Sequence, residues 1–571
     1  MRVPTATWKA APEPSVEPNP RLTAEGPIGA RLARLLARRE LSDDDEVESY
    51  LSPSVADLHD PGLLSDLPEA VERLLTSRER GETVAIVGDY DVDGVTATAM
   101  LLAVFGATGL SAQSILPHRM AEGYGFQSVH VDRALAEGAS LILTVDCGAR
   151  SVDAASYALD EGLSVIITDH HIPGAAHDER VLHVNPQRPD CEYPFPGLSG
   201  AGLAFKLAMA FSRAAGREVD PTLLLRVACL GTIADLVPLV GENRVIAALG
   251  LAALETTRSA GLKALIRVAR VRQPVKASDV GFRLGPRLNA AGRMDSPEPA
   301  LELLLERDAV RAAELAETLD RWNEDRQRAE ASVVEQARER FLEIEGDGPP
   351  LLMAWDESWH RGVLGIAAGR IAREFHRPAV LLAVREGEAV GSGRSIRGLH
   401  LHDFLSGFED RFLRFGGHSQ AIGVSIDAEG LDGVREEIVA AADDWDPELL
   451  VPSHLYEEHL DARELSMELV RQIERLEPFG MANRRPVFRL GPFTLAIPPR
   501  EFGKNHLGLR GRDSSGTLVD MVAWGWGDRP EVFSGSFEIL AHLKIDDYLG
   551  RPAAEIVDAR PASPPAPGMK P

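Results

Sequence analysis

Cysteine is scarce in this sequence, and the few cysteines present form no pattern. Cys147, Cys191 and Cys229 are the only ones in 571 residues, and they lie far apart and are odd in number. This spacing excludes a zinc knuckle built on a CxxC pair. It also argues against a framework of disulfide bonds.

Long apolar runs are also missing. No segment approaches the roughly 18 consecutive apolar residues of a membrane span, and the first stretch, MRVPTATWKAAPEPSVEPNPR, lacks the apolar centre of a signal peptide. We therefore expect a cytoplasmic protein with no membrane partner. A length of 571 residues with 44% hydrophobic residues predicts several folded domains.

Positive charge is scarce over the chain as a whole, which carries a formal net charge of −26. This balance argues against a protein that binds nucleic acid over its whole surface, but not against a local basic region. Residues 479–512 hold seven Arg or Lys against one acid, with Phe479, Phe488, Phe493 and Phe502 interleaved. Such a segment is typical of a surface that stacks the bases of a single strand, although the phenylalanines fit a core equally well.

The stretch TVAIVGDYDVDGVTATAM, Thr83 to Met100, organises the chain. Its apolar first half predicts a buried parallel strand, and a helix is expected after Gly94. Asp89, Asp91 and Asp93 lie between them, at the carboxyl end of a strand, where open α/β sheets bind ligands. Like charges this close repel one another unless a cation neutralises them. Taken alone, the stretch fits an Asp-rich surface turn equally well.

The same order of strand and acid recurs downstream. LILTVDCGAR ends its apolar run at Asp146, and SVIITDHHIPG leads into Asp169, His170 and His171. A further acid, Asp235, follows a helical stretch in ACLGTIADLVPL. Strands and helices that alternate at this length predict a doubly wound parallel sheet, with these side chains at one edge.

Carboxylates and an imidazole at one edge suit two divalent ions such as Mn²⁺ or Mg²⁺ better than zinc with thiolates. Two such ions about 3.5 to 4 Å apart bind a phosphate, activate a water and stabilise the leaving oxygen of an in-line displacement. A carboxylate shared by both ions must lie between them, and Asp146 is our choice. The residues therefore predict a metal-dependent reaction at phosphorus.

Four motifs, GDYDVDGVTAT, TVDCGAR, ITDHH and GTIADLVPL, resemble in this order those of the DHH phosphoesterase superfamily. RFGGHSQAIGVSI resembles the glycine-rich signature of the associated DHHA1 domain. GPRLNAAGRMDSP and GSGRSIRG resemble segments of the superfamily's single-strand-specific 5′-to-3′ DNA exonucleases, and the similarity covers roughly residues 50–560. The resemblance implies release of mononucleotides from single-stranded DNA in DNA repair and recombination. Its candidate protein partners are a single-strand-binding protein or a RecQ-type helicase.

The resemblance also implies the metal ligands. Asp91 binds one ion, Asp93, His170 and Asp235 bind the other, and Asp146 binds both.

Three neighbouring residues complete this expected centre. Asp89 is a further candidate ligand, because Val87 stands where many relatives have a histidine. Asp169 orients an imidazole, as metal-bound histidines usually require. His171 contacts the scissile phosphate, so we expect catalytic roles for Asp169 and His171.

Separate segments offer groups for a terminal 5′ phosphate, which bidentate arginine contacts suit. The candidates are Arg119 after the second strand, Arg287, Asn289 and Arg293 in GPRLNAAGR, and Ser392 and Arg394 in GSGRS. Each arginine alone fits an ordinary surface charge or ion pair equally well, and the pocket is implied by the resemblance. In RFGGHSQ, Gly417 permits close backbone approach, and His418 and Gln420 offer donors to a nucleic-acid backbone.

The expected fold class is α/β. It comprises a doubly wound parallel-sheet DHH domain, a long connecting helix, a DHHA1 α/β domain and a C-terminal OB-like β-barrel. We place an N-terminal arm and helix at 1–50, the DHH domain at 51–300, the connecting helix at 301–345 and the DHHA1 domain at 346–450. The barrel is expected at 451–560, where short segments alternate like antiparallel strands, and a disordered proline-rich tail at 561–571.

Two other functions use the same features. A DHH-family phosphodiesterase acting on short oligoribonucleotides or cyclic dinucleotides needs the same metals but no OB-like barrel, so the barrel favours a polymer substrate. A non-catalytic DNA-binding DHH relative would have lost ligands, and here only Val87 departs from the pattern. An ATP-driven motor is poorly supported, because the only Gly-Lys pair, Gly503-Lys504, is followed by Asn505 rather than Ser or Thr.

Overall fold

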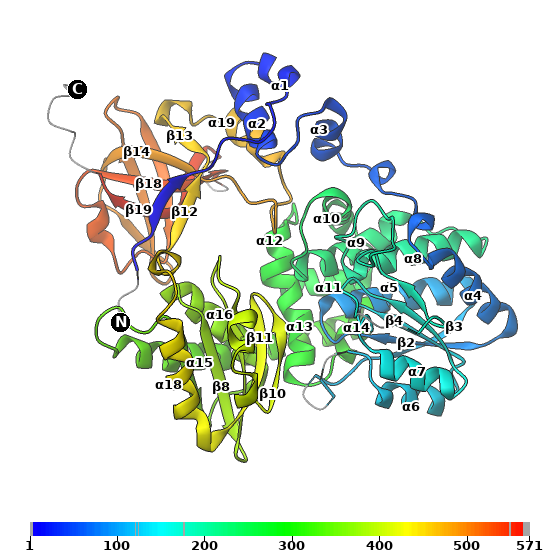
Figure 1. Ribbon diagram of the computed structural model, residues 1–571. Helices are drawn as coiled ribbons and strands as arrows, with labels where there is room; N and C mark the ends of the chain where they lie inside the picture. Colours follow the sequence, from blue (N-terminus) through cyan, green and yellow to red (C-terminus); the bar gives the residue numbers. More distant parts are fainter. Residues whose placement is uncertain (1–3, 120–121, 124, 175–177, 547–549, 563–571) are drawn as a thin grey trace. The chain divides into compact units, whose positions relative to one another are not determined.

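The computed structural model describes residues 4–119, 122–123, 125–174, 178–546 and 550–562 (Figure 1). Most of the tail that we expect to be disordered therefore lies outside the described residues. The chain divides into two compact units. The first consists of Met1–Thr7, His59–Val237 and Leu249–Pro452, and the second of Trp8–Leu58, Pro238–Ala248 and Ser453–Pro571.

A five-stranded parallel sheet forms the first half of unit one. Its order is β3-β2-β4-β5-β6, that is Ser111–Ile115, Thr83–Gly88, Leu141–Val145, Ser164–Thr168 and Leu182–Val184. The helices around it are α4 (Leu67–Arg80), α5 (Val92–Thr108), α6 (Ser128–Ala136), α7 (Val152–Asp160), α8 (Gly200–Ala214) and α9 (Pro221–Ala234). Helices α6 and α7 pack on one face through an apolar core, and α5 and α8 contact the strands of the sheet from the other. The predicted doubly wound sheet is confirmed.

A layer of helices follows the sheet. Its members are α10 (Gly241–Glu255), α11 (Ala260–Val268), α12 (Ala277–Asp279), the π-helical turn η3 (Val280–Leu284), α13 (Gly285–Met294), α14 (Glu298–Leu305) and α15 (Ala309–Leu342). Within unit one, α15 packs against α11, α13 and α16 (Leu364–Phe375). The segment that we expected to be one helix is two, because the Asp308 carboxylate accepts hydrogen bonds from the amides of Val310 and Arg311 and caps α15.

A second α/β domain completes unit one. Its sheet order is β10-β11-β9-β8-β7, that is Arg414–His418, Ala421–Asp427, Glu388–Arg394, Ala379–Arg385 and Leu352–Asp356. Only the β7 and β8 pair is parallel among these strands. Helix α16 packs on β8 and β9, and α17 (Leu401–Ser406) and α18 (Leu431–Ala442) add to the same core around Trp359 and Phe375.

Unit two is built on a closed barrel. Strands β14 (Phe488–Leu495), β18 (Phe537–Ile545), β19 (Pro552–Pro561), β17 (Leu518–Trp524) and β16 (His506–Arg512) pair in this order, and β14 pairs again with β16. Short strands β13 (Glu458–Leu460) and β15 (Arg500–Phe502) extend its edges, and β12 (Ser453–Tyr456) pairs with β1 (Thr7–Ala10). The predicted OB-like barrel is confirmed.

The N-terminal helices belong to this barrel unit. Helices α1 (Pro20–Ala24), α2 (Pro27–Ala37) and α3 (Asp44–Leu51) share its apolar core with α19 (Met467–Glu474). Arg31 forms ion pairs with Glu458 and, at 2.9 Å, with Glu464. The segment expected as an arm is thus packed structure, while the boundaries of the individual domains remain a prediction.

Of the helices described, none is by itself both long and apolar enough to cross a membrane, and the one pair that passes jointly, Gly241–Glu255 with Ala260–Val268, is bent by 89°.

Candidate metal centre and phosphate-binding residues

The carboxyl edge of the parallel sheet gathers the predicted acids. Asp89 follows β2, and Asp91 caps α5 by accepting hydrogen bonds from the amides of Asp93, at 2.8 Å, and Gly94, at 3.2 Å. The capping geometry turns Asp93 inward, where it is buried. The local sequence thus fixes the loop through a cap, a standard way for a helix start to order an acidic segment.

The Asp93 carboxylate lies against the start of α8. It accepts hydrogen bonds from the amides of Gly200, at 2.7 Å, and Ala201, at 2.9 Å. Helix N-termini favour negative charge, so α8 offsets part of the cost of burying this acid. A Cβ at position 200 would lie 2.6 Å from the Cβ of Asp146, so only glycine fits between the two acids.

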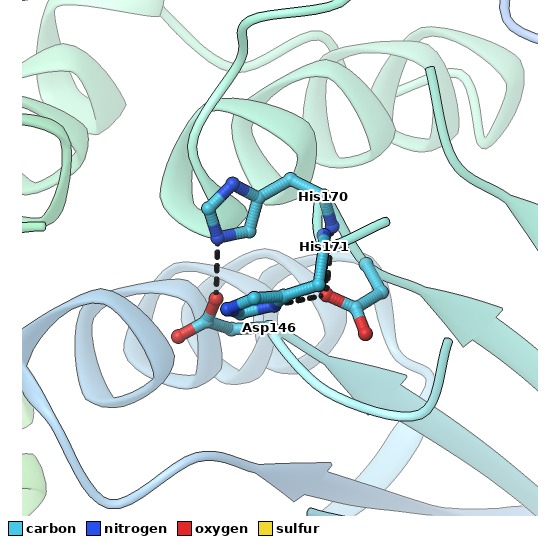
Figure 2. A group of neighbouring side chains, drawn as sticks. Asp146, His170 and His171 are labelled. Atoms are coloured by element: carbon cyan, nitrogen blue, oxygen red, sulfur yellow. Dashed lines mark hydrogen bonds and ion pairs between the residues drawn. The ribbon is translucent and has the colours of Figure 1, made fainter. Parts of the chain in front are cut away.

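His170 and Asp146 face each other across the site (Figure 2). His170 Nε2 lies 3.1 Å from Asp146 Oδ1, 3.6 Å from Asp235 Oδ2 and 3.9 Å from Asp93 Oδ2. The His170 ring also hydrogen-bonds the backbone of Leu198, which leaves Nε2 directed at the acids. His170 Nε2 and Asp146 Oδ1 are both buried, and neither makes a hydrogen bond of acceptable geometry.

The ligand atoms form overlapping groups, each within 4.8 Å. One group contains Asp93, His170 and Asp235, and another contains Asp89, Asp91 and Asp146. Asp146 also lies within the same distance of His170, so it is common to both sides of the site. Oxygen donors with one imidazole, and buried polar atoms without partners, fit hard divalent ions such as Mn²⁺ or Mg²⁺.

Burial and mutual repulsion shift the pKa values of these groups in the ion-free protein. Burial and the charge of Asp91 raise the pKa of Asp93 to about 7. Burial and the charge of Asp93 raise the pKa of Asp235 to about 9 and hold that of Asp146 well above its usual range. Burial lowers the pKa of His170 to about 4. The raised pKa values mean that these carboxyl groups bind protons more tightly than free aspartates do, and that a bound cation would compete with those protons.

Asp169 and His171 adjoin this cluster, and their ligand atoms lie within 4.8 Å of those of Asp146 and His170. Asp169 accepts hydrogen bonds from the Ala149 amide and from His171 Nδ1, both at 2.8 Å. Burial raises the pKa of Asp169, but these hydrogen bonds outweigh burial and hold it below its usual value. Burial likewise lowers the pKa of His171, yet Asp169 holds it above its usual value. The imidazole that Asp169 orients is thus that of His171, whose side chain is 47% exposed.

Three of the predicted arginines come together without a carboxylate partner among the described residues. The Arg119 guanidinium lies 4.8 Å from the centre of the Tyr90 ring. Arg293 Nη1 donates to the Gly362 carbonyl at 3.3 Å, and Arg394 Nη1 donates to its neighbour Gly393. Burial, with the charge of Arg119, lowers the pKa of Arg293 to about 9 and also lowers that of Arg394. Such mutual repulsion is typical of an anion site.

The other predicted contacts are placed differently. Arg287 is paired with Asp320 at 2.8 Å and so joins α13 to α15. Asn289 is half-buried on α13, and Ser392 is half-buried on β9 opposite Gly423. The charge of Arg287 is thus already neutralised within the protein.

The loop between β10 and β11 holds the remaining candidates. Gly417 has a φ of 143°, and a Cβ there would lie 2.3 Å from the Ala421 carbonyl, so the turn requires glycine. His418 is exposed, and burial and the charges of Arg394 and His171 lower its pKa. Gln420 Nε2 donates to the Leu399 carbonyl at 3.3 Å. Of these three residues, His418 is therefore the one whose pKa responds to the charges of Arg394 and His171.

Sequence reasoning missed the helix start at Gly200 and Ala201, whose amides hold Asp93. The signal was present in LSGAG, where Ser199 precedes three small residues and caps α8 by accepting from the Gly202 amide. Small residues after a capping serine indicate a helix N-terminus that a charged group can approach closely.

A parallel sheet that gathers acids and two adjacent histidines at its carboxyl edge defines a phosphoesterase of the DHH class. Residues 83–232 match the DHH family N-terminal domain, residues 348–445 the DHHA1 domain and residues 456–557 the RecJ OB domain. A single-stranded-DNA-specific exonuclease RecJ of Bacillus subtilis (strain 168) is 35% identical over 544 residues, which is 94% of this chain and 68% of that relative. The chain belongs to the RecJ family.

Two solved structures extend the similarity to three dimensions. RecJ in complex with Mn²⁺ from Thermus thermophilus superposes with a TM-score of 0.83 at 30% identity, over 99% of this chain and 81% of that one. RecJ in complex with Mg²⁺ from the same organism gives 0.78 at 28% identity, over 98% and 79%. The likeness therefore includes all the domains of this chain.

Proposed function

We propose that this protein is a metal-dependent exonuclease that hydrolyses single-stranded DNA from the 5′ end and releases mononucleotides in DNA repair and recombination. One observation carries the reaction class: buried, unpartnered carboxylate and imidazole atoms converge at one sheet edge. The name of its relatives, single-stranded-DNA-specific exonuclease, supports the substrate class. The proposed setting is the cytoplasm, with a single-strand-binding protein or a RecQ-type helicase as partner.

The cofactor that we propose is a pair of divalent ions, and the names of the solved relatives support Mn²⁺ or Mg²⁺ as the metal. Asp93, His170 and Asp235 would hold one ion, Asp91 the other with Asp89 beside it, and Asp146 both. When bound, two such ions supply Lewis-acid polarisation of a phosphoryl oxygen and a water of lowered pKa.

The chain's own residues position the phosphodiester and manage protons. Asp169 holds His171 through Nδ1, next to Asp146 and His170, and the His171 side chain is 47% exposed. Burial lowers the pKa of His171, but Asp169 outweighs burial and holds it above its usual value, so this imidazole keeps its proton to a higher pH than a free histidine does and can donate to a phosphate oxygen. His171 is thus the proposed catalytic contact and Asp169 its positioning residue.

The 5′ polarity rests on Arg119, Arg293 and Arg394. A terminal phosphate carries more negative charge than an internal phosphodiester, so it gains most from three neighbouring arginines that lack carboxylate partners. We propose that they hold this group, with Asn289, Ser392 and the loop of Gly417, His418 and Gln420 as further contacts. The charge of Arg287 is paired with Asp320, so we propose that Arg287 helps to position α13 and does not itself contact the phosphate.

The barrel supports a polymer substrate. One side of it carries a groove of about 490 Å³ lined by Arg500, Phe502, Trp524 and Lys544, among others. The Trp524 ring is 48% exposed and packs edge to face on Phe502 at 5.5 Å between centroids. Cations around an exposed aromatic ring suit the stacking of one base of a single strand.

A substrate panel tests this function. Single-stranded DNA, blunt duplex DNA, a short oligoribonucleotide and a cyclic dinucleotide are incubated with the protein in Mn²⁺ and in EDTA. We expect rapid conversion of the single strand to mononucleotides in Mn²⁺ only. Faster turnover of the cyclic dinucleotide or the oligoribonucleotide would replace the proposal with a small-substrate phosphodiesterase, and equal turnover of duplex would refute strand selectivity.

A further inference from the structure

A second basic region lies outside the metal centre, between residues 263 and 287. It contains Lys263, Arg267, Arg270, Arg272, Lys276, Arg283 and Arg287 against a single acid, Asp279. The whole chain holds 61 Lys and Arg against 87 Asp and Glu, so this concentration of positive charge is against the trend of the chain. We name it the α11–η3 basic surface; its residues run from α11 through α12 and η3 to the first turn of α13, and Figure 1 labels the three α-helices.

Three arginines of this surface are exposed and, within the described part of the chain, unpaired, whereas Arg283 is paired with Asp279 and Arg287 with Asp320. Arg267, Arg270 and Arg272 are exposed, and among the residues that the structure describes none has a carboxylate within ion-pair distance. The barrel shows the contrast, since Arg485 is paired with Glu555 at 2.9 Å. An arginine in the last turn of a helix interacts favourably with the helix dipole. This stabilising effect explains the presence of Arg267 in α11 but not that of Arg272, which lies beyond the helix.

One contact joins the two parts of the surface. Arg283 Nη1, from η3, donates to the carbonyl of Arg270, at the end of α11, at 3.2 Å. The π-helical turn also places Phe282 in the open, where it is 79% exposed. An aromatic side chain exposed among cations combines the two groups that single-stranded nucleic acid needs, charge for phosphates and a flat ring for a base.

The η3 end of this surface is linked to the candidate active site through two elements of the same unit. Gly285, which follows η3, lies against Ala234, the residue before Asp235. Helix α13 then runs ten residues, about 15 Å, from η3 toward Arg293 beside the metal centre. The end of η3 is therefore separated from Arg293 by the length of one short helix in the same compact unit.

We propose that the α11–η3 basic surface binds the part of a single strand that lies beyond the metal centre, with its arginines on phosphates and Phe282 stacked on a base. The inference rests on the proposed function, because it adds a binding surface for the same substrate. A single strand is favoured over a duplex because a stacking ring needs an unpaired base. Because the rest of the chain carries a net negative charge, a polyanion such as DNA can bind only where positive charge is concentrated locally, as on this surface.

The test compares two variants with two matched controls. Arg267→Gln with Arg272→Gln removes two unpaired surface charges, and Arg217→Gln with Arg373→Gln removes two exposed arginines elsewhere in the unit. Phe282→Ala is matched by Val310→Ala, another exposed apolar residue, at the start of α15. Binding of a labelled 30-nucleotide single strand and of a duplex is measured by fluorescence anisotropy in EDTA, from about 0.05 to 0.2 M salt.

Two lost phosphate contacts should reduce the magnitude of the salt slope by about 1.4. The ratio of parent to variant affinity should therefore fall about 7-fold as the salt concentration rises from about 0.05 to 0.2 M. Phe282→Ala should weaken single-strand binding about 5- to 150-fold, in the range measured for base stacking, and leave duplex binding unchanged. Both controls should bind like the parent protein. Hydrolysis of a four-nucleotide 5′-phosphorylated substrate should keep its kcat in every variant, because such a substrate reaches only the centre.

The outcomes separate the two proposals. If the parent protein hydrolyses single strands but the arginine variant keeps its affinity and salt slope, the α11–η3 inference is overturned and the function stands. If Phe282→Ala weakens duplex and single strand equally, or neither, the stacking role is overturned. If the parent neither binds nor hydrolyses single strands, the proposed function fails and this inference fails with it.

Discussion

Replacing Asp146 by asparagine removes one negative charge from the middle of the acid cluster and keeps the side-chain shape. Asp146 has a φ of 61°, a left-handed conformation that asparagine tolerates well. The new amide group can donate to His170 Nε2, which lies 3.1 Å from Asp146 Oδ1 and has no hydrogen bond. Because burial lowers the pKa of His170 to about 4, that nitrogen is an acceptor at neutral pH.

Without metal, this substitution should stabilise the protein. Burial and repulsion by Asp93 hold the pKa of Asp146 well above its usual range. Folding at pH 8 therefore requires either that a carboxylate is buried beside other negative charges or that Asp146 takes up a proton, and both cost free energy. A buried polar atom left without a hydrogen bond costs about 1 to 3 kcal/mol, and the asparagine amide would satisfy His170 Nε2. We expect Asp146→Asn to gain about 1 to 3 kcal/mol in EDTA at pH 8, a rise in Tm of roughly 2 to 8 °C.

With metal, the order should reverse. A ligand that binds only the folded state at 100 times its Kd stabilises by about 2.7 kcal/mol. The parent protein should gain this in Mn²⁺ and the variant much less, because it has lost the carboxylate common to both ligand groups. Loss of such a ligand should lower kcat by more than the roughly 10- to 100-fold typical of outer-shell partners.

Differential scanning fluorimetry in EDTA and in Mn²⁺, together with nuclease kinetics, checks each part. Asp235→Asn is the matched comparison, because Asp235 belongs to one ligand group only and should retain more of the Mn²⁺ stabilisation. Two results would refute the reasoning: a variant less stable than the parent in EDTA, or near-parental turnover by Asp146→Asn in saturating Mn²⁺.

Three further predictions follow from the same structure. In EDTA, burial raises the pKa of Asp93 to about 7 and of Asp235 to about 9, so the folded state binds protons more tightly than the unfolded state. Tm should therefore fall as pH rises toward 9, because the raised carboxyls outnumber His170, whose lowered pKa acts in the opposite direction below about pH 6.5. The profile should flatten in Mn²⁺, and a flat profile in EDTA would contradict the shifts. Arg394→Ala should slow hydrolysis of 5′-phosphorylated more than of 5′-hydroxyl single strands, with exposed Arg397→Ala as control, and equal losses on both would mean that Arg394 does not contact the end. Trp524→Ala should weaken single-strand binding about 5- to 150-fold at a temperature where the variant is folded, which Tm checks because Trp524 also packs on Phe502 and donates to Glu555. Unchanged affinity would remove the barrel groove from the binding path.

The metal centre could be predicted from the sequence because it depends on local order. Asp89, Asp146 and Asp169 each follow a short apolar strand directly, and parallel strands bring such positions to one edge. Contacts between distant segments could not be predicted in this way. Arg287 lies in a glycine-rich motif typical of phosphate contacts, yet Asp320, on another helix, neutralises it.

The basic barrel segment shows the same limit. Phe488 and Phe493 alternate with cations, but they point into the barrel core and are buried, while Phe502 lies in the groove. Residues 8–58 share that core, which no local pattern in the sequence indicates. Deleting residues 451–571 would therefore uncover apolar side chains of the N-terminal helices, so point substitutions such as Trp524→Ala test the barrel more cleanly.

The most direct test of the central claim uses one single strand with different labels at its two ends. The parent protein and Asp146→Asn are incubated with it in Mn²⁺, and the products are separated over time. Two-metal hydrolysis from the 5′ end predicts that the 5′ label appears first, as a mononucleotide, and that the variant releases almost none. Release of the 3′ label first, internal fragments as early products, or equal rates for the two proteins would contradict the account.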